Sequence, residues 1–141
     1  MQITINSQDL NSEAPLPPLY RVRQRWASQP IADVSATVGA ELERLGLRAR
    51  ISQGARIAVT AGSRGIRDIV PITRAAVDWL RAAGATPFIV PAMGSHGGAT
   101  AAGQLKLLTA LGISEEQMGC PIHSSMEVVQ VGSIADGPPV Y

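Results

Sequence analysis

The chain has 141 residues and a net charge of +1, and 45% of its residues are hydrophobic although only 4% are aromatic. This length fits one domain with a buried core, and the balanced charge argues against nucleic acid or an anionic membrane as a partner. The single cysteine, Cys120, excludes an intrachain disulfide and a cysteine metal cluster, and the lack of a long apolar run or a signal-peptide pattern predicts a cytoplasmic protein with no membrane segment.

Residues 1–27 are expected to form an extended N-terminal arm. Prolines at positions 15, 17 and 18 exclude a helix in its first part. Residues 20–26 alternate between arginine and apolar side chains, a pattern that predicts an edge strand. Arg21, Arg23 and Arg25 then form an ordinary solvated strand face or, alternatively, contact an anion or another subunit.

The α/β domain is expected to span residues 28–141 and to begin with a helix. Apolar side chains recur at three- and four-residue spacing, which predicts a packing helix that opens near residues 28–30 and ends at Gly46. The apolar positions of this face are Ile31, Val34, Val38, Leu42 and Leu45.

A strand, a helix and a second strand are predicted between residues 57 and 90. Small and β-branched side chains at 57–61 suit a strand buried on both faces, and residues 87–90 form the second strand. The helix at 68–83 has Asp68 as its expected N-cap, Pro71 in its first turn and Gly84 as a left-handed C-terminal residue. A βαβ unit of this length predicts parallel strands in a Rossmann-like, open and mainly parallel sheet with flanking helices.

Two glycine-rich loops leave the carboxyl ends of these strands, at residues 62–65 and 94–98. The ends of parallel strands lie along one edge of a sheet, where ligands bind. Ser63, Arg64, Ser95 and His96 are therefore expected to converge although they lie far apart in sequence.

Further elements are expected after the second loop. Thr100 is the expected cap of a helix that closes at Gly112, and Ser114 begins a Ser-x-x-Gln capping box for a short helical turn. Residues 126–131 are a candidate third strand, and residues 136–139 form a turn. The chain stops where the next element of an α/β protein would begin, so we expect that it is part of a larger protein or that it needs a partner.

The two loops have the composition of an anion site. Glycine lets the backbone approach a phosphate or carboxylate closely, so Gly62, Ser63 and Arg64 are expected to contact one anion, and Arg64 can make a two-pronged contact. Ser95, Gly97 and Gly98 form a second candidate loop for an anion or substrate. Alternatively, the glycines only make tight turns, because neither loop matches a Walker or Gly-x-Gly-x-x-Gly motif.

His96 is the candidate acid and base, because an imidazole exchanges a proton near neutral pH and the glycines beside it leave room for a substrate. Otherwise it is an ordinary exposed or structural histidine. His123 lies in a polar turn and is set aside, and Cys120 is expected to be a packed small residue. A serine nucleophile is not predicted, because the chain lacks a Gly-x-Ser-x-Gly elbow.

The segments 61–66, 91–100 and 124–129 together resemble the N-terminal domain of the lactate racemase family, and Gly-Ser-His-Gly-Gly-Ala-Thr at residues 94–100 is the most specific of them. The resemblance implies a two-domain α/β isomerase that racemises or epimerises a 2-hydroxy acid through a nickel-pincer nucleotide. It places His96 at a catalytic histidine and Gly62, Ser63 and Arg64 at the cofactor. It places no metal ligand in this chain, because the pincer lysine, the second catalytic histidine and the nickel-binding histidine belong to the C-terminal domain, so the chain alone is expected to be inactive.

The first loop departs from true lactate racemases, which have Asp-His-Thr-Arg-Pro where this chain has Ala61, Gly62, Ser63 and Arg64. This difference favours a divergent subfamily that acts on another hydroxy acid. The alternative function is a non-catalytic α/β module that binds a phosphate- or carboxylate-bearing ligand through the two loops. The expected partners are the hydroxy acid and the missing C-terminal domain, and a homo-oligomer is compatible with the sequence.

Overall fold

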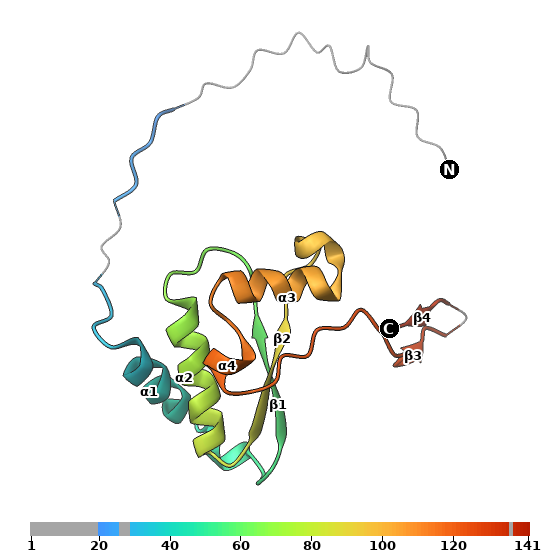
Figure 1. Ribbon diagram of the computed structural model, residues 1–141, viewed down its shortest axis with the longest axis horizontal. Coiled ribbons are helices and arrows are strands. Elements are labelled where there is room, and N and C mark those ends of the chain that lie inside the picture. Colours follow the sequence, from blue (N-terminus) through green and yellow to red (C-terminus); the bar gives the residue numbers. More distant parts are fainter. Residues whose placement is uncertain (1–19, 26–28, 136) are drawn as a thin grey trace. The chain divides into compact units, whose positions relative to one another are not determined.

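The computed structural model describes residues 20–25, 29–135 and 137–141 (Figure 1). The chain divides into two units, Met1–Pro30 and Ile31–Tyr141. Residues 1–19 and 26–28, which include most of the expected N-terminal arm, lie outside the described residues. Residues 20–25 are exposed and have no regular secondary structure, so the edge strand predicted there is wrong in its described part. Alternation supplies two faces, but a strand also requires a neighbour to pair with its backbone.

The second unit is built on two parallel strands. β1 (Arg56–Ala61) pairs with β2 (Thr86–Pro91) in a register that runs from Arg56 opposite Thr86 to Ala61 opposite Pro91. The helix α2 (Ile69–Ala82) connects them. The predicted strand, helix and strand are thus confirmed, and the fold is a small α/β structure with a two-stranded parallel sheet packed against helices.

The ends of α2 differ in how well local sequence predicts them. Gly84 has φ 89°, which confirms the left-handed C-terminal residue. Asp68 does precede the helix, but its φ of 61° is left-handed and its side chain makes no capping hydrogen bond. The predicted side-chain cap is therefore wrong, because an N-cap carboxylate needs an extended backbone to reach the first N–H groups.

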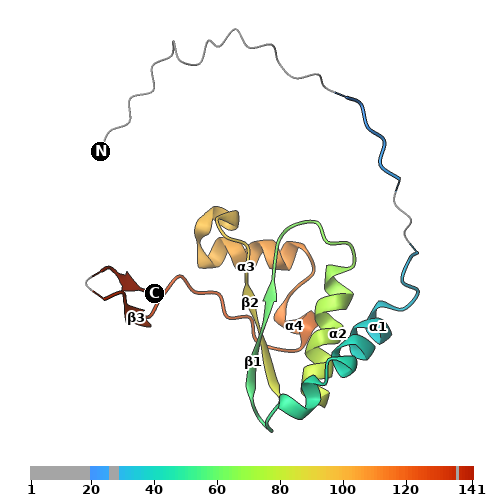
Figure 2. The ribbon, with the colours of Figure 1, turned by 180° about the vertical axis from the view of Figure 1, so that it is seen from behind.

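β1 is not buried on both faces as predicted. Ile57, Val59 and Ala61 are turned to the core, whereas Ala58 and Thr60 are exposed. Figures 1 and 2 show α2 between α1 (Val34–Arg44) and the sheet, with α4 (Glu115–Met118) beside it. Within the described chain the helices cover one face of the sheet, so β1 alternates as a half-covered strand does.

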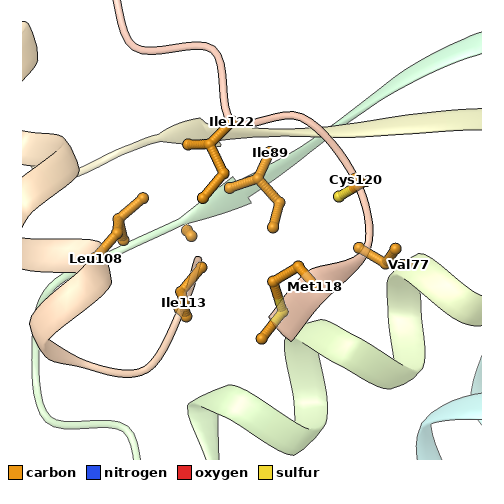
Figure 3. Close-up of a cluster of buried hydrophobic side chains, with 8 residues drawn as sticks. Val77, Ile89, Leu108, Ile113, Met118, Cys120 and Ile122 are labelled. Atoms are coloured by element: carbon orange, nitrogen blue, oxygen red, sulfur yellow. The ribbon is translucent and has the colours of Figure 1, made fainter. Parts of the chain in front are cut away.

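One hydrophobic core fills the space between the sheet and the helices (Figure 3). Its buried side chains come from β1, β2, α2, α3 (Ala101–Ala110), α4 and the segments next to α4: Ala61, Val77, Ile89, Leu108, Ile113, Met118, Cys120 and Ile122. A second cluster joins Trp79, Leu80 and Ala85 to half-buried residues of α1 and β1. The first core includes Ala61, the last residue of β1, and Met93, just before the second loop, packs against it. The core thus reaches the starts of both glycine loops.

The first helix, α1 (Val34–Arg44), begins later than predicted. Asp33 caps it, with Oδ1 accepting a hydrogen bond of 2.8 Å from the N–H of Ala36. Ile31 precedes the helix and is 59% exposed, so the predicted start near residues 28–30 is wrong. The helix begins after Asp33, because this side chain accepts a hydrogen bond from a free N–H of the first turn, although the apolar periodicity extends back to Ile31.

Local capping predicts the next two helices correctly. Thr100 caps α3 (Ala101–Ala110) by accepting a hydrogen bond from Gly103 N–H, and Ser114 caps α4 (Glu115–Met118) by accepting one from Gln117 N–H. In both cases the signal is a side-chain oxygen placed before a helical turn, which depends only on neighbouring residues.

The third strand predicted at residues 126–131 is wrong, because these residues have no regular secondary structure. The chain does approach β2, but earlier: Ile122 forms a parallel bridge with Ile89. In that register Ser124 would stand opposite Pro91, the last residue of β2, so residues 126–131 run past the end of that strand. A short hairpin follows, in which β3 (Gly132–Ser133) pairs antiparallel with β4 (Pro139–Val140). The turn predicted at residues 136–139 lies within this hairpin. Its first residue, Asp136, is outside the described residues.

Glu43 links α1 to the rest of the unit. Its Oε1 accepts hydrogen bonds from Arg48 Nη2 at 2.5 Å, in the 3₁₀ helix η2 (Leu47–Arg50), and from Trp79 Nε1 at 3.0 Å, in α2. The hydrogen bond with Arg48 is the main cause that holds the pKa of Glu43 below its ordinary value, and Trp79 adds to it. One carboxylate thus joins three helical segments.

This arrangement predicts a pH-dependent effect of Glu43→Gln. A carboxyl group whose pKa is lowered in the folded state stabilises that state above its unfolded pKa, and this contribution is lost as the pH falls through the folded pKa. The variant should therefore melt below the wild type at pH 7, and the difference should shrink as the pH falls below the ordinary range of glutamate. Thermal unfolding followed by circular dichroism across this range measures both effects.

Glu41→Gln is the matched control, because among the described residues Glu41 pairs only with Arg44 on its own helix, and both side chains are largely exposed. Its effect should be small at every pH. A Glu43→Gln difference that stayed constant from pH 7 to pH 3 would contradict the role of the ionised carboxylate.

Candidate functional site

The two glycine loops meet at the carboxyl ends of β1 and β2. Ser63 Oγ, in the first loop, lies 2.5 Å from His96 Nδ1, in the second. Just below, Ala92 N–H donates to Ala61 O at 2.8 Å and continues the parallel pairing into the loops. The predicted convergence is confirmed for Ser63 and His96.

The second loop is a tight turn. His96–Ala99 forms the 3₁₀ helix η3, in which Gly97 and Gly98 both have φ 67°. Gly97 also packs against α3, because a Cβ there would lie 2.5 Å from the carbonyl carbon of Gly103. Gly98 has open space around it, and Ser95 precedes η3 as an exposed residue without a capping bond. The anion role of Ser95, Gly97 and Gly98 stays a prediction.

Three hydrogen bonds fasten the second loop to the start of α3. Thr100 Oγ1 donates to Gly97 O at 3.1 Å and accepts from Gly103 N–H at 3.1 Å. Gln104 Nε2 donates to Gly94 O at 2.8 Å, and the Gln104 side chain is buried, with 6% of the residue exposed. The segment that carries His96 is therefore fixed on both sides of the histidine.

A cleft of about 320 Å³ opens beside the first loop. Gly62, Ser63 and Arg64 line it on one side, and Met93 and Gly94 lie on the other. Arg64 is exposed and makes no ion pair with the described residues. The three residues predicted to contact an anion thus share one cleft with a guanidinium free to pair. The N-terminus of α2 is separate from it, because that helix begins only at Ile69.

A larger cleft of about 450 Å³ lies on the other side of the same segment, so that Ala92, Met93 and Gly94 line both. Its remaining lining residues are Val90, Pro91, Gln104, His123, Ser125 and Met126. The ring of His123 also lies edge-on to Phe88, with centroids 5.0 Å apart. His96 lines neither cleft but reaches the smaller one through Ser63.

Sequence reasoning missed Gln104 and set His123 aside. Gln104 follows the Thr100 cap by one helical turn and lies four residues before Leu108, so it falls on the apolar face of the helix, which is a signal for a buried hydrogen bond. Nothing in the sequence indicates that residues 123–126 lie beside the end of β2. Cys120 is buried, and burial raises the pKa of its thiol, so it is packed rather than reactive as predicted.

Within the described ranges, no three His, Cys, Asp or Glu side chains come together as a metal site, and no helix is both long and apolar enough to cross a membrane. The chain was also compared with known proteins. No family model, no curated protein and no solved structure matches it.

The close approach of Gly97 and Gly103 predicts a strong effect of Gly103→Ala. The added methyl group would overlap the carbonyl oxygen of Gly97, so the loop or α3 must move. We expect the free energy of unfolding to fall by about 1–3 kcal/mol, the range for overpacking a tight contact. Urea unfolding followed by circular dichroism measures it.

Gly39→Ala in α1 is the matched control, because an added Cβ there would meet its nearest neighbour, Trp79 Cδ1, only at 4.0 Å. This change should stabilise the chain by about 0.5–1 kcal/mol through helix propensity. If both variants shifted stability in the same direction and amount, the contact between the loop and α3 would not be tight.

Proposed function

We propose that this chain is the N-terminal α/β part of a lactate racemase-like isomerase that acts on a 2-hydroxy acid with a nickel-pincer nucleotide. His96 is the acid and base in this proposal. The observation that carries it is the contact between Ser63 Oγ and His96 Nδ1, because it joins the two loops of the family motif at one point.

The contact with Ser63 suits a histidine that takes and returns a proton. When His96 is neutral with its proton on Nδ1, it donates to Ser63 Oγ, and the lone pair of Nε2 can accept the hydroxyl proton of a substrate. When the ring is protonated, Nδ1–H still donates to the same oxygen. Ser63 therefore holds the ring through the whole proton cycle.

The first loop fits the anionic end of a nucleotide or a hydroxy acid. Gly62 and Ser63 allow close approach of the backbone, and Arg64 provides a free guanidinium in the same cleft. In this proposal the metal is held by the C-terminal domain, as the family resemblance implies. The chemistry that the bound cofactor supplies is reversible acceptance of the hydride from C2 of the acid.

The same proposal includes a Rossmann-like sheet that is completed in a larger protein. Two features support it: one face of β1 is uncovered at Ala58 and Thr60, and Val128, Val129 and Val131 are each more than two-thirds exposed. A sheet and an apolar segment of this kind gain free energy when further elements cover them.

A non-catalytic binding module is the second candidate function. The smaller cleft favours it, because Arg64 and the backbone of Gly62 can hold a phosphate or carboxylate without any contribution from His96. In this case the Ser63–His96 contact only stiffens the loop. Removal of the imidazole distinguishes the two functions, because it should abolish isomerisation by an isomerase and leave ligand binding by a binding module unchanged.

We expect His96→Asn in the longest natural form of the protein to reduce isomerisation by about 100-fold or more, the usual value of a positioned acid and base. The measurement is chiral chromatography of 2-hydroxy acids labelled with deuterium at C2, with cofactor supplied by its biosynthetic enzymes. Ser63→Ala should cause a smaller loss and shift the pH profile, because the imidazole keeps its nitrogen but loses its support. Unchanged turnover in His96→Asn, with a normal circular dichroism spectrum, would refute the assignment.

Arg64→Gln tests the anion site without any turnover. Titration with inorganic phosphate, followed by ¹H–¹⁵N NMR, should shift the amides of residues 62–64 in the wild type. The variant should bind about tenfold more weakly, because a charge-assisted hydrogen bond is lost. Arg67→Gln is the matched control, since Arg67 lies in the same connection but is paired with Asp68 at 3.7 Å and does not line the cleft. Equal weakening by both changes would indicate general charge attraction instead of a site.

A further inference from the structure

Gln104 presents an unused acceptor at the larger cleft. Only 6% of the residue is exposed, and its Nε2 is committed to Gly94 O. Among the described residues no group donates a hydrogen bond to its Oε1. Every fully buried side-chain oxygen of the described residues has a hydrogen-bond partner, so Oε1 is not fully buried. Oε1 is therefore at least partly open to solvent, and Gln104 lines the larger cleft.

The larger cleft is neutral. Among the described residues that line it there is no Asp, Glu, Lys or Arg, and its walls combine apolar side chains such as Met93 and Met126 with the polar groups of Gln104, His123 and Ser125. A charged ligand group would lose its hydration there without a fixed counter-charge. A neutral group with a hydrogen-bond donor would satisfy Gln104 Oε1 and keep apolar contacts with the methionines.

The size and position of the cleft indicate what part of a ligand it takes. Its volume of about 450 Å³ is that of a small-molecule pocket, far more than a methyl group needs. It adjoins the smaller cleft along Ala92, Met93 and Gly94, so one molecule can occupy both.

We propose that the larger cleft is the side-chain pocket of the site and selects 2-hydroxy acids whose chain beyond C2 is longer than methyl, uncharged and carries a hydroxyl that donates to Gln104 Oε1. This inference rests on the proposed function. The carboxylate lies in the smaller cleft toward Arg64, the 2-hydroxyl lies on the side of Ser63, which contacts His96, and the rest of the chain lies beside Gln104. Lactate has only a methyl group beyond C2 and so has no hydroxyl there to donate to Gln104 Oε1, and a dicarboxylate such as malate carries a second carboxylate for which the described lining has no Lys or Arg.

Four acids test the proposal on the chain of 141 residues. 2,4-Dihydroxybutanoate carries the required hydroxyl, 2-hydroxypentanoate replaces it with a methyl group, malate replaces the hydroxymethyl group with a carboxylate, and lactate ends before it. Dissociation constants come from ¹H–¹⁵N NMR titration, and the side-chain amide signal of Gln104 reports the contact directly. We expect 2,4-dihydroxybutanoate to bind about five- to tenfold more tightly than 2-hydroxypentanoate, the value of one neutral hydrogen bond, and more tightly still than malate and lactate.

Gln104→Met removes the acceptor at nearly constant length and should bring the ratio between the first two acids close to one. If this variant does not fold, the ratio in the wild type still decides. Malate or lactate binding as tightly as 2,4-dihydroxybutanoate, a ratio near one in the wild type, or no binding of any of the four acids would overturn the proposal.

These outcomes are separate from those of the proposed function. The ratio between ligands depends on Gln104 and needs no turnover. His96→Asn tests turnover and leaves the larger cleft unchanged. If the protein discriminated between the acids and His96→Asn kept its isomerase activity, the catalytic role of His96 would be refuted and the pocket would stand. If His96→Asn lost turnover and the protein did not discriminate between the acids, the pocket would be refuted and the catalytic role would stand.

Discussion

Parallel pairing of β1 with β2 is the constraint on which the rest of the structure depends. Six residue pairs, from Arg56 opposite Thr86 to Ala61 opposite Pro91, end the two strands at the same level. Both loops therefore leave the sheet side by side, although more than thirty residues separate Ser63 from His96. The core beneath them, formed around Val77 and Ile89, holds this level fixed because it packs α2 against both strands.

The two loops differ in how firmly they are held. The second is bound to α3 through Thr100 and Gln104 and through the close approach of Gly97 to Gly103. The first has one short backbone bond, from Ile66 N–H to Arg64 O at 2.7 Å, and its Arg64 is exposed. A fixed histidine beside a more adaptable arginine suits a site where proton transfer requires exact placement and charge pairing tolerates some movement.

The sequence correctly predicts the elements that depend on neighbouring residues, and it fails for those that depend on distant contacts. Thr100, Ser114 and Gly84 act through neighbouring residues, and their helix ends were predicted correctly. Residues 126–131 have the composition of a strand, but their pairing depends on the distant register of Ile122 with Ile89. The exposed face of β1 likewise depends on where helices pack, and the strand run alone cannot show it. In the site, topology brought Ser63 to His96, whereas the larger cleft arises from the approach of residues 123–126 to β2 and has no local signal.

The bond from Gln104 to Gly94 has a thermodynamic consequence. Gly94 lines both clefts, and Gln104 holds its carbonyl while lining the larger one. A ligand that displaced Gln104 would also move the Gly94 carbonyl in the wall of the neighbouring cleft, and the two occupancies would then be energetically linked. Linkage is reciprocal. If a ligand group beside Gln104 raised the affinity for an anion at Arg64 by some factor, the anion would raise the affinity for that group by the same factor. The two halves of a substrate would then bind cooperatively through one main-chain carbonyl.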